Sequence, residues 1–333
     1  MTGWQVAEFP REARDVPRKV LVEGAWLSAF QRGDLRSFET PNRWMSGAVY
    51  DADNDLVVES QMVGSYGGRN LLAADPGRIS RRGRRDQLSG TWLYGGNFMK
   101  HFGHFISEGV STLWPDDVTV DGLVFHRYLH RRPELAEFHR ELLRYAGYGD
   151  LPVHIVSSRP AEVERLWVPS RPVVVNGWAH PQAVDVWRRI AANAGGPAPE
   201  ANRVWFSRVA FNDRRRARGQ KVRSAPERDR ELDAIFGAAG FRVIAPETLP
   251  VRDQVRVVAG ADVLAGQAGT ALHLAVFAEA GTRCIEVGDG RTPDKPLLNQ
   301  QVLNAVRGHQ VAFIPEALPA KRIARMLVRL RVS

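Results

Sequence analysis

Apolar residues in the second half of the chain follow two alternating patterns. Short apolar runs, typical of buried strands, lie at 203–206, 241–244, 261–265, 283–287 and 311–314. Between them, apolar residues at helical spacing predict helices over 230–239, 249–259 and 270–278, and a basic helix is predicted at 319–332. Strands that alternate with helices of this length predict an α/β fold with a parallel, doubly wound sheet.

The first half of the chain has a less regular pattern. Residues 1–95 have the short apolar runs and turn residues of strands and loops. Helices are then predicted at 97–114, 133–146 and 182–193, and strands at 118–125, 153–156, 164–168 and 173–175. Residues 194–200 hold two glycines and two prolines, as in a linker. We therefore predict an N-terminal domain over 1–193 and a C-terminal domain over 194–333, whose last helix could also pack back on the N-terminal domain.

The composition is that of a globular protein large enough for two domains. Its 333 residues are 44% hydrophobic and 25% charged, which allows a sizeable core. No apolar run approaches the ~20 residues of a membrane-spanning helix, and residues 1–12 lack the segments of a signal peptide. Cys284 is the only cysteine, so no intrachain disulfide forms and a cysteine-based zinc site is disfavoured. We expect a cytoplasmic protein.

The chain is strongly basic, with a formal net charge of +9. Its 46 basic residues are spread along most of the sequence, with local clusters at 78–85 and 214–218. A nucleic-acid-binding protein more often concentrates its cations in a stripe interleaved with aromatic residues. The charge therefore favours an anionic substrate or peripheral contact with an anionic membrane, and nucleic acid is the less favoured partner.

The most informative segment is the glycine-bearing turn at 266–270. It follows the apolar strand 261–265 and precedes a predicted helix. Gly266 and Gly269 let the backbone approach a bound group closely, and the N–H groups at a helix start attract anions. Glu286 ends the next strand, where a carboxylate can accept hydrogen bonds from ribose hydroxyls. The turn lacks G-x-G-x-x-G spacing, so a nucleotide diphosphate is favoured over a nicotinamide dinucleotide.

Basic residues follow the first strand of the same predicted sheet. Ser207 and Arg208 come directly after 203–206, and an arginine at the carboxyl end of a parallel strand can pair with phosphate oxygens. Lys221 and the cluster at 214–216 follow on the next loop. They could close over a pyrophosphate, although a solvated basic loop is equally consistent with the pattern.

A candidate acid–base pair lies on the helix predicted at 97–114. His104 and Glu108 are four residues apart, so they share a helix face and can form a hydrogen bond. A histidine oriented by a carboxylate is a suitable general base near neutral pH. His101 and His104 also have a spacing that could serve zinc, but no H-E-x-x-H motif and no evident third ligand accompany them. A histidine that only packs the helix is the alternative.

These segments together resemble glycosyltransferase family 61, which includes bacterial capsule-type transferases and eukaryotic O-linked N-acetylglucosaminyl- and xylosyltransferases. The resemblance covers roughly residues 90–290. Its matching pieces, in the family's order, are 97–114 around Gly103-His104-Phe105, 204–208, Glu231-Leu232 and 260–286. The chain departs from the family at Gln267, where members often have histidine, and at 228–230, where the usual Asn-Glu before Glu-Leu is absent.

The resemblance implies a GT-B fold, in which two Rossmann-like domains face a cleft. It also implies inverting transfer of a sugar from a nucleotide-sugar donor to a glycan or lipid-linked saccharide, without metal or other cofactor, as in bacterial surface polysaccharide synthesis. We expect His104 to act as the base, supported by Glu108. The candidate donor-binding residues are Ser207, Arg208, Lys221, Gly266, Gln267, Ala268, Gly269, Thr270 and Glu286. The alternatives are a nucleotide-sugar epimerase of the same build and a non-catalytic, basic nucleic-acid-binding protein.

Overall fold

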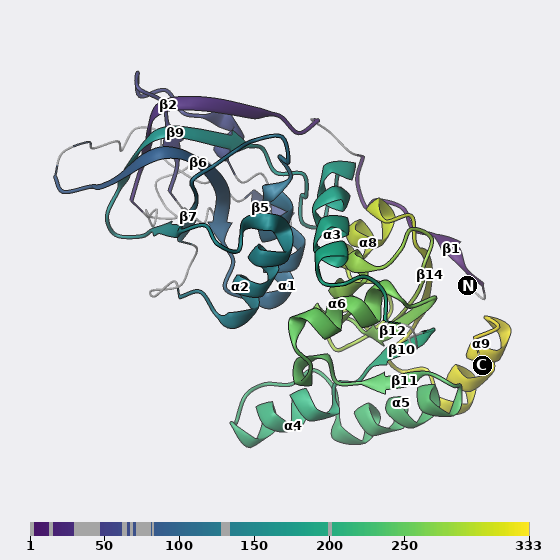
Figure 1. The fold of residues 1–333 in the computed structure, drawn as a ribbon. Helices are drawn as coiled ribbons and strands as arrows, with labels where there is room; N and C mark the ends of the chain where they lie inside the picture. Colours follow the sequence, from purple (N-terminus) through teal and green to yellow (C-terminus); the bar gives the residue numbers. More distant parts are fainter. Residues whose placement is uncertain are drawn as a thin grey trace. The chain divides into compact units, whose positions relative to one another are not determined.

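The computed structural model describes residues 3–12, 16–29, 47–61, 65–66, 69–70, 81, 83–127, 134–198 and 202–332, and these form two compact units (Figure 1). The C-terminal unit comprises Met1–Pro10 with Ile190–Ser333, and the N-terminal unit comprises Arg11–Arg189. Two predicted segments lie partly outside the described residues. These are the basic cluster at 78–85, of which 78–80 and 82 are not described, and the linker at 194–200, of which the last two residues are not described.

The C-terminal unit contains a six-stranded sheet with the strand order β1-β14-β13-β12-β10-β11. Its strands are β1 (Gln5–Val6), β10 (Arg203–Phe206), β11 (Arg242–Ile244), β12 (Val263–Gln267), β13 (Arg283–Val287) and β14 (Gln310–Ile314). The last five are mutually parallel, as predicted, and β1 adds an antiparallel edge strand beside β14. In chain order the parallel strands run 2-1-3-4-5, so the winding direction reverses between β10 and β12.

Helices cover both faces of this sheet (Figure 1). On one face, α5 (Pro226–Ala238) and α9 (Ala320–Arg329) bury Phe236 and Leu327 in one core with strand residues such as Trp205 and Ala265. On the other face lie α6 (Val251–Ala259), α7 (Thr270–His273), η7 (Leu274–Phe277) and α8 (Leu298–Val306). Each strand therefore alternates its side chains between two apolar layers, which is the doubly wound arrangement.

The terminal helix α9 belongs to the C-terminal unit. The sequence also allowed this helix to pack on the N-terminal domain, residues 1–193. In the structure Ile323, Leu327 and Leu330 are buried in the core of the C-terminal unit, and the Trp4 Nε1–H group donates a 3.1 Å hydrogen bond to the Leu330 carbonyl. The apolar face of α9 thus covers the sheet of its own unit, and its basic residues lie on the surface.

The N-terminal unit is built on a mixed sheet with the order β3-β2-β9-β6-β7-β8. Its strands are β2 (Lys19–Leu27), β3 (Val49–Tyr50), β6 (Asp86–Phe98), β7 (Gly122–Arg127), β8 (Val153–Val156) and β9 (Ala161–Pro169). The four strands β9, β6, β7 and β8 are parallel, whereas β2 pairs antiparallel with β9 and β3 pairs antiparallel with β2 at one edge. The short elements η1 (Val58–Ser60), β4 (Ser65–Tyr66) and β5 (Arg69–Asn70) complete its first part.

Two of the three helices predicted for residues 97–193 are shorter and less regular than their patterns indicate. The helix predicted at 97–114 begins at Phe102, because β6 extends to Phe98. The helix predicted at 133–146 is α2 (Glu137–Leu143), followed by the π-helical turn η5 (Arg144–Tyr148), and α3 (Pro181–Asn193) agrees with its prediction. The strand predicted at 173–175 is wrong, since this segment forms a turn closed by a single bridge between Val173 and Ala179.

Candidate functional site

The candidate site of the C-terminal unit lies at the carboxyl edge of β10 and β12. These strands are neighbours in the sheet, and Phe206 of β10 is in register with Gly266 of β12. Ser207 and Arg208 follow β10, and Ala268 and Gly269 follow β12. In open α/β sheets, ligands bind outside the carboxyl ends of the strands at the point where the winding reverses. The fold therefore brings the two sequence-predicted segments together at this point.

Gly269 has a backbone conformation that only glycine adopts readily. Its φ of 137° and ψ of −167° place it in a region that is strained for any residue with a Cβ. Ala268 before it is tied to the sheet, because its N–H group donates to the Val287 carbonyl at 2.8 Å. The nine-residue helix predicted from Thr270 is shorter, with one α-turn, α7, followed by the 3₁₀ turn η7. Its dipole is correspondingly small, so side chains supply most of the positive charge at this turn.

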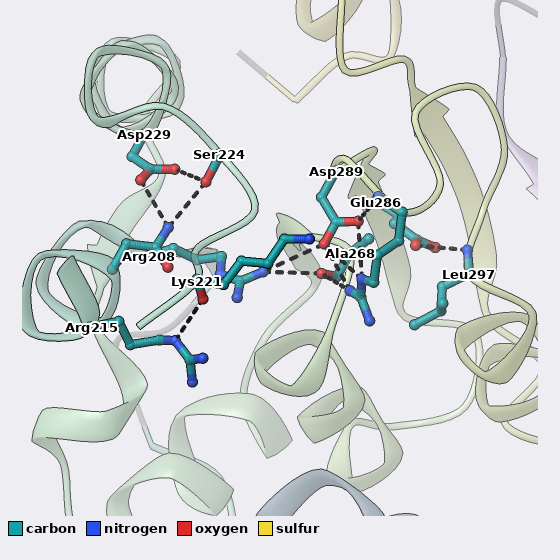
Figure 2. A network of polar contacts seen from close by, with 11 residues as sticks. Arg208, Arg215, Lys221, Ser224, Asp229, Ala268, Glu286, Asp289 and Leu297 are labelled. Atoms are coloured by element: carbon teal, nitrogen blue, oxygen red, sulfur yellow. Dashed lines mark hydrogen bonds and ion pairs between the residues drawn. The ribbon is translucent and has the colours of Figure 1, made fainter. Parts of the chain in front are cut away.

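Arg208 reaches from the end of β10 to the glycine turn. Its side chain is 14% exposed, and its Nη1 group donates to the Ala268 carbonyl at 3.1 Å (Figure 2). Asp289 lies 3.8 Å from the same nitrogen. Burial lowers the pKa of Arg208, Asp289 opposes this shift, and the nearby Arg223 and Arg291 guanidinium groups lower the pKa further. The Arg208 guanidinium group is thus repelled by two neighbouring guanidinium groups, and a bound anion would offset this repulsion.

Two further arginines join Arg208, and neither was predicted from the sequence. Arg291 donates through Nη2 to the Ala268 carbonyl and to Asp289 Oδ2, each at 2.8 Å. A Cβ atom built on Gly269 would lie 3.3 Å from Arg291, 3.5 Å from Arg208 and 4.0 Å from Arg223, each measured to a guanidinium nitrogen. Three guanidinium groups therefore surround one glycine. We call Arg208, Arg223 and Arg291 the arginine cluster.

One buried carboxylate organises the arginine cluster. The Asp289 side chain is 1% exposed, accepts hydrogen bonds from Arg291 and lies within ion-pair distance of Arg208. The three guanidinium groups and this carboxylate have a summed formal charge of +2. Arg208 is largely buried, the Arg291 side chain is 34% exposed and Arg223 is exposed. Together they can attract a multiply charged anion, and guanidinium groups match phosphate oxygens in geometry.

Ser207 has a structural partner instead of an open hydroxyl. Its Oγ–H group donates to Asp233 Oδ2 at 2.6 Å and its Oγ accepts from the Val209 N–H group at 3.2 Å. Asp233 also accepts a hydrogen bond from Trp205 Nε1 at 2.7 Å. Ser207 therefore anchors the start of α4 (Val209–Ala217) to α5. Its predicted contact with donor phosphate stays a prediction.

Lys221 lies on the exposed segment 218–225, which joins α4 to α5 and which we call the basic loop. Its carbonyl accepts a hydrogen bond from Arg215 Nε at 3.1 Å, and in Figure 2 its side chain extends toward Arg208 and Asp289. The cluster at 214–216 is largely paired, since Arg214 contacts Glu247 at 2.9 Å and Arg216 contacts Asp213 at 2.8 Å.

Glu286 is buried, whereas the sequence suggested a carboxylate presented at a strand end. It is 4% exposed, and its Oε1 atom accepts a 2.9 Å hydrogen bond from the N–H group of Leu297, which precedes α8. Burial raises the pKa of Glu286 to about 8, and the Leu297 hydrogen bond only partly opposes this shift. Of the other predicted residues, Gln267 is also buried, within β12, and Gly266 packs closely on Phe206.

The predicted histidine–glutamate contact is present in the N-terminal unit. His104 ends α1 (Phe102–His104), and Glu108 lies in the π-helical turn η3 (Phe105–Gly109), which continues into η4 (Val110–Leu113). His104 Nδ1 and Glu108 Oε1 are 2.5 Å apart. Glu108 is 4% exposed and the His104 side chain 42% exposed, so the carboxylate holds the ring from the interior. π-helical turns are frequent at functional sites.

The protonation of His104 is set by this contact. The hydrogen bond to Glu108 raises the pKa of His104 above its ordinary value, and burial opposes the rise. Nδ1–H is the donor to Glu108, so the second ring nitrogen carries the lone pair in the neutral form. Among the described residues, no group of three or more His, Cys, Asp or Glu side chains is placed to hold a metal ion.

The fold and the arginine cluster define an α/β protein with a candidate anion-binding site at the switch point of its parallel sheet. The sequence model of the family Glycosyltransferase 61 matches residues 102–285, more than half of the chain. The chain therefore belongs to glycosyltransferase family 61, which confirms the resemblance. It is a glycosyltransferase, and its substrates are a sugar donor and an acceptor. Comparison with curated proteins finds no match.

The matched region includes the histidine–glutamate pair, Arg208, Arg223 and the glycine turn. It begins at Phe102, ahead of His104 and Glu108, and ends at residue 285, within β13. Glu286, Asp289 and Arg291 lie after the matched region. No helix within the described ranges is long and apolar enough to cross a membrane.

Proposed function

We propose that this protein transfers a sugar from a nucleotide-sugar donor to a saccharide or glycan acceptor with inversion. The observation that carries the proposal is the convergence of three guanidinium groups on Gly269. A nucleoside diphosphate carries its negative charge on two adjacent phosphates, and the arginine cluster together with Asp289 has a summed formal charge of +2. The glycine turn lets the phosphates approach the backbone without meeting a side chain.

The proposed reaction is a single displacement. The acceptor oxygen forms a bond to the anomeric carbon as the bond from that carbon to the diphosphate oxygen breaks. The acceptor proton passes to a base and the electron pair leaves with the nucleoside diphosphate. Arg208, Arg223 and Arg291 stabilise the developing charge of the leaving group, so we propose that no metal is needed. Glu286 is the proposed partner of the ribose hydroxyls.

His104 is the proposed base. Its neutral form accepts the proton at the ring nitrogen that does not face Glu108, and Glu108 then stabilises the imidazolium. Because Glu108 raises the pKa of His104, the base form gains population as the pH rises through that pKa. This role requires the two units to form a GT-B-like pair of Rossmann-like domains facing a cleft, and that arrangement is part of the proposal.

The proposed setting is bacterial surface polysaccharide synthesis at the cytoplasmic face of a membrane, with a glycan or lipid-linked saccharide as acceptor. Support comes from α9, whose exposed side carries Lys321, Arg322, Arg325 and Arg329 around the exposed Val328. Each cation near an anionic membrane adds about 1 kcal/mol of binding. Binding to vesicles with anionic lipid, and none to neutral vesicles, would support this setting.

The test of the function is a binding and turnover experiment. We expect nucleoside diphosphates to raise the melting temperature of the protein with EDTA present, by mass action. Arg208→Ala should weaken that binding about ten- to a hundred-fold, since a charge-assisted contact contributes about 1.5–3 kcal/mol. Incubation with donor alone separates transfer from epimerisation, because an epimerase converts the donor without an acceptor. No binding of any nucleoside diphosphate or nucleotide sugar would refute the proposal.

A further inference from the structure

The end of the basic loop is held by one buried carboxylate. Asp229, in the first turn of α5, is 2% exposed. Its Oδ1 atom accepts a 2.6 Å hydrogen bond from Ser224 Oγ (Figure 2). Its Oδ2 atom accepts a 2.9 Å hydrogen bond from Asn212 Nδ2. Asn212 lies on α4, before the basic loop, and Ser224 lies near the end of the loop. Asp229 therefore joins the two sides of the loop.

Arg216 and Asn212 close this network. Arg216 Nη2 donates to Asp229 Oδ2 at 3.1 Å and to the Ser224 carbonyl at 2.9 Å. Asn212 Nδ2 also lies 3.0 Å from Ser224 Oγ. A carboxylate so deeply buried is stable as an anion only with several donors, and three side chains supply them here. We call Asn212, Arg216, Ser224 and Asp229 the loop clamp.

The loop clamp lies directly beside Arg223 in the sequence. Ser224 is the next residue, and the Arg223 carbonyl accepts a hydrogen bond from the Gly290 N–H group at 3.4 Å. The backbone of Arg223 is therefore fixed from the side of α5 and from the side of the turn after β13. Its guanidinium group reaches to 4.0 Å from a Cβ position on Gly269. Without this restraint, an exposed basic loop has to be ordered at each binding event, which weakens binding.

We propose that Asp229 is a positioning residue that sets Arg223 at the diphosphate site before the donor binds. The inference rests on the proposed function, because it takes the arginine cluster as the donor phosphate site. Asp229 touches no substrate in this proposal. It acts through Ser224 and the loop backbone, so its contribution to binding exists only while the Arg223 guanidinium group is present.

A double-mutant cycle measures this dependence. The probe is inorganic pyrophosphate, titrated by calorimetry in EDTA, with UDP as a second probe. Arg223→Ala and Asp229→Asn should each weaken pyrophosphate binding about ten- to a hundred-fold, since each removes one placed guanidinium contact. The double variant should bind no more weakly than either single variant. Losses that multiply, or an Asp229→Asn protein that binds as tightly as the wild type, overturn the proposal.

A reciprocal swap separates positioning from loss of folding. Asp229→Asn removes the negative charge that faces Arg216 and replaces one of the two acceptor oxygens by an NH2 group, so the clamp loses its ion pair and one acceptor. The pair Asn212→Asp with Asp229→Asn restores one carboxylate and one amide in the clamp, and we expect it to recover most of the affinity. If Asp229→Asn does not fold, Ser224→Ala removes a single hydrogen bond from the clamp, and the same cycle with Arg223→Ala applies.

A control and the wild-type titration complete the test. Ile323→Val trims the core under α9 without touching the basic loop, so pyrophosphate affinity should be unchanged below its melting temperature. A wild-type protein that binds neither pyrophosphate nor UDP refutes the proposed function. A wild-type protein that binds both, with an additive cycle for Asp229 and Arg223, leaves the proposed function in place and refutes only the positioning role.

Discussion

Replacing Glu286 by glutamine should change how the stability of the C-terminal unit depends on pH. Glu286 is buried, and its pKa is raised from 4.5 to about 8. The folded state therefore holds a proton that the unfolded state releases between these two pH values. The resulting stabilisation is fully present below pH 4.5 and is lost as the pH rises through 8.

The magnitude follows from the width of that interval. Each pKa unit corresponds to about 1.4 kcal/mol, so the carboxyl group accounts for up to about 5 kcal/mol of pH-dependent stability. Water penetration and local relaxation reduce this value, and we expect roughly 2–5 kcal/mol. Glutamine keeps an oxygen for the Leu297 N–H group and does not titrate, so its variant lacks this dependence.

The assay is urea unfolding of the wild type and Glu286→Gln at pH 5 and at pH 8. All other titrating groups are common to both proteins, so the difference between their unfolding free energies isolates Glu286. The wild type should lose stability relative to the variant as the pH rises. If the difference between the unfolding free energies of the wild type and the variant is the same at pH 5 and at pH 8, the carboxyl group does not hold its proton in this range. The reasoning from burial would then be wrong.

The same carboxyl group links proton release to donor binding. At pH 7 a group with a pKa of about 8 is about nine-tenths protonated, and hydrogen bonds from ribose hydroxyls favour the ionised form. UDP binding should therefore release up to about one proton at pH 7, measured by calorimetry in buffers of different ionisation enthalpy. Pyrophosphate, which has no ribose, serves as the control. Equal proton release for both ligands would show that Glu286 does not bind the ribose hydroxyls.

Three further predictions test the glycine turn, the acid–base pair and the core. Gly269→Ala should destabilise the protein by about 1–3 kcal/mol, because alanine is strained at a φ of 137°, and should weaken UDP binding by displacing Arg291. An unchanged melting temperature and an unchanged UDP affinity by calorimetry would contradict this. Glu108→Gln should lower the pKa of His104 and therefore move the acid limb of the kcat/KM profile to lower pH. An acid limb that does not move, or near-normal turnover of His104→Ala, would show that His104 is not the base. Phe236→Ala, which removes a buried ring stacked 4.0 Å from Trp205, should cost about 3–5 kcal/mol in urea unfolding, and a loss below ~1 kcal/mol would show that this core is not packed as described.

The local pattern of the chain determined the architecture of the C-terminal sheet. Apolar runs with turn residues between them are sufficient to place β10 to β14, because the central strands β10, β12 and β13 are buried on both faces and need apolar residues at most positions. The contact between His104 and Glu108 was also predictable, since residues four apart meet on one helix face whatever the rest of the fold does. Gly266 and Gly269 marked the turn for the same local reason.

The tertiary structure alone decided which charges meet at that turn. Arg223 and Arg291 lie 68 residues apart in the sequence, yet both guanidinium groups approach Gly269 because the loops after α4 and β13 converge at one edge of the sheet. Periodicity carries no information about such a convergence. Burial of Glu286 and the pairing of β1 with β14 likewise depend on packing across the whole unit. The sequence thus determined where backbone could approach an anion, and the strand order decided which side chains surround it, since only the order of the strands sets the distance between loops far apart in the chain.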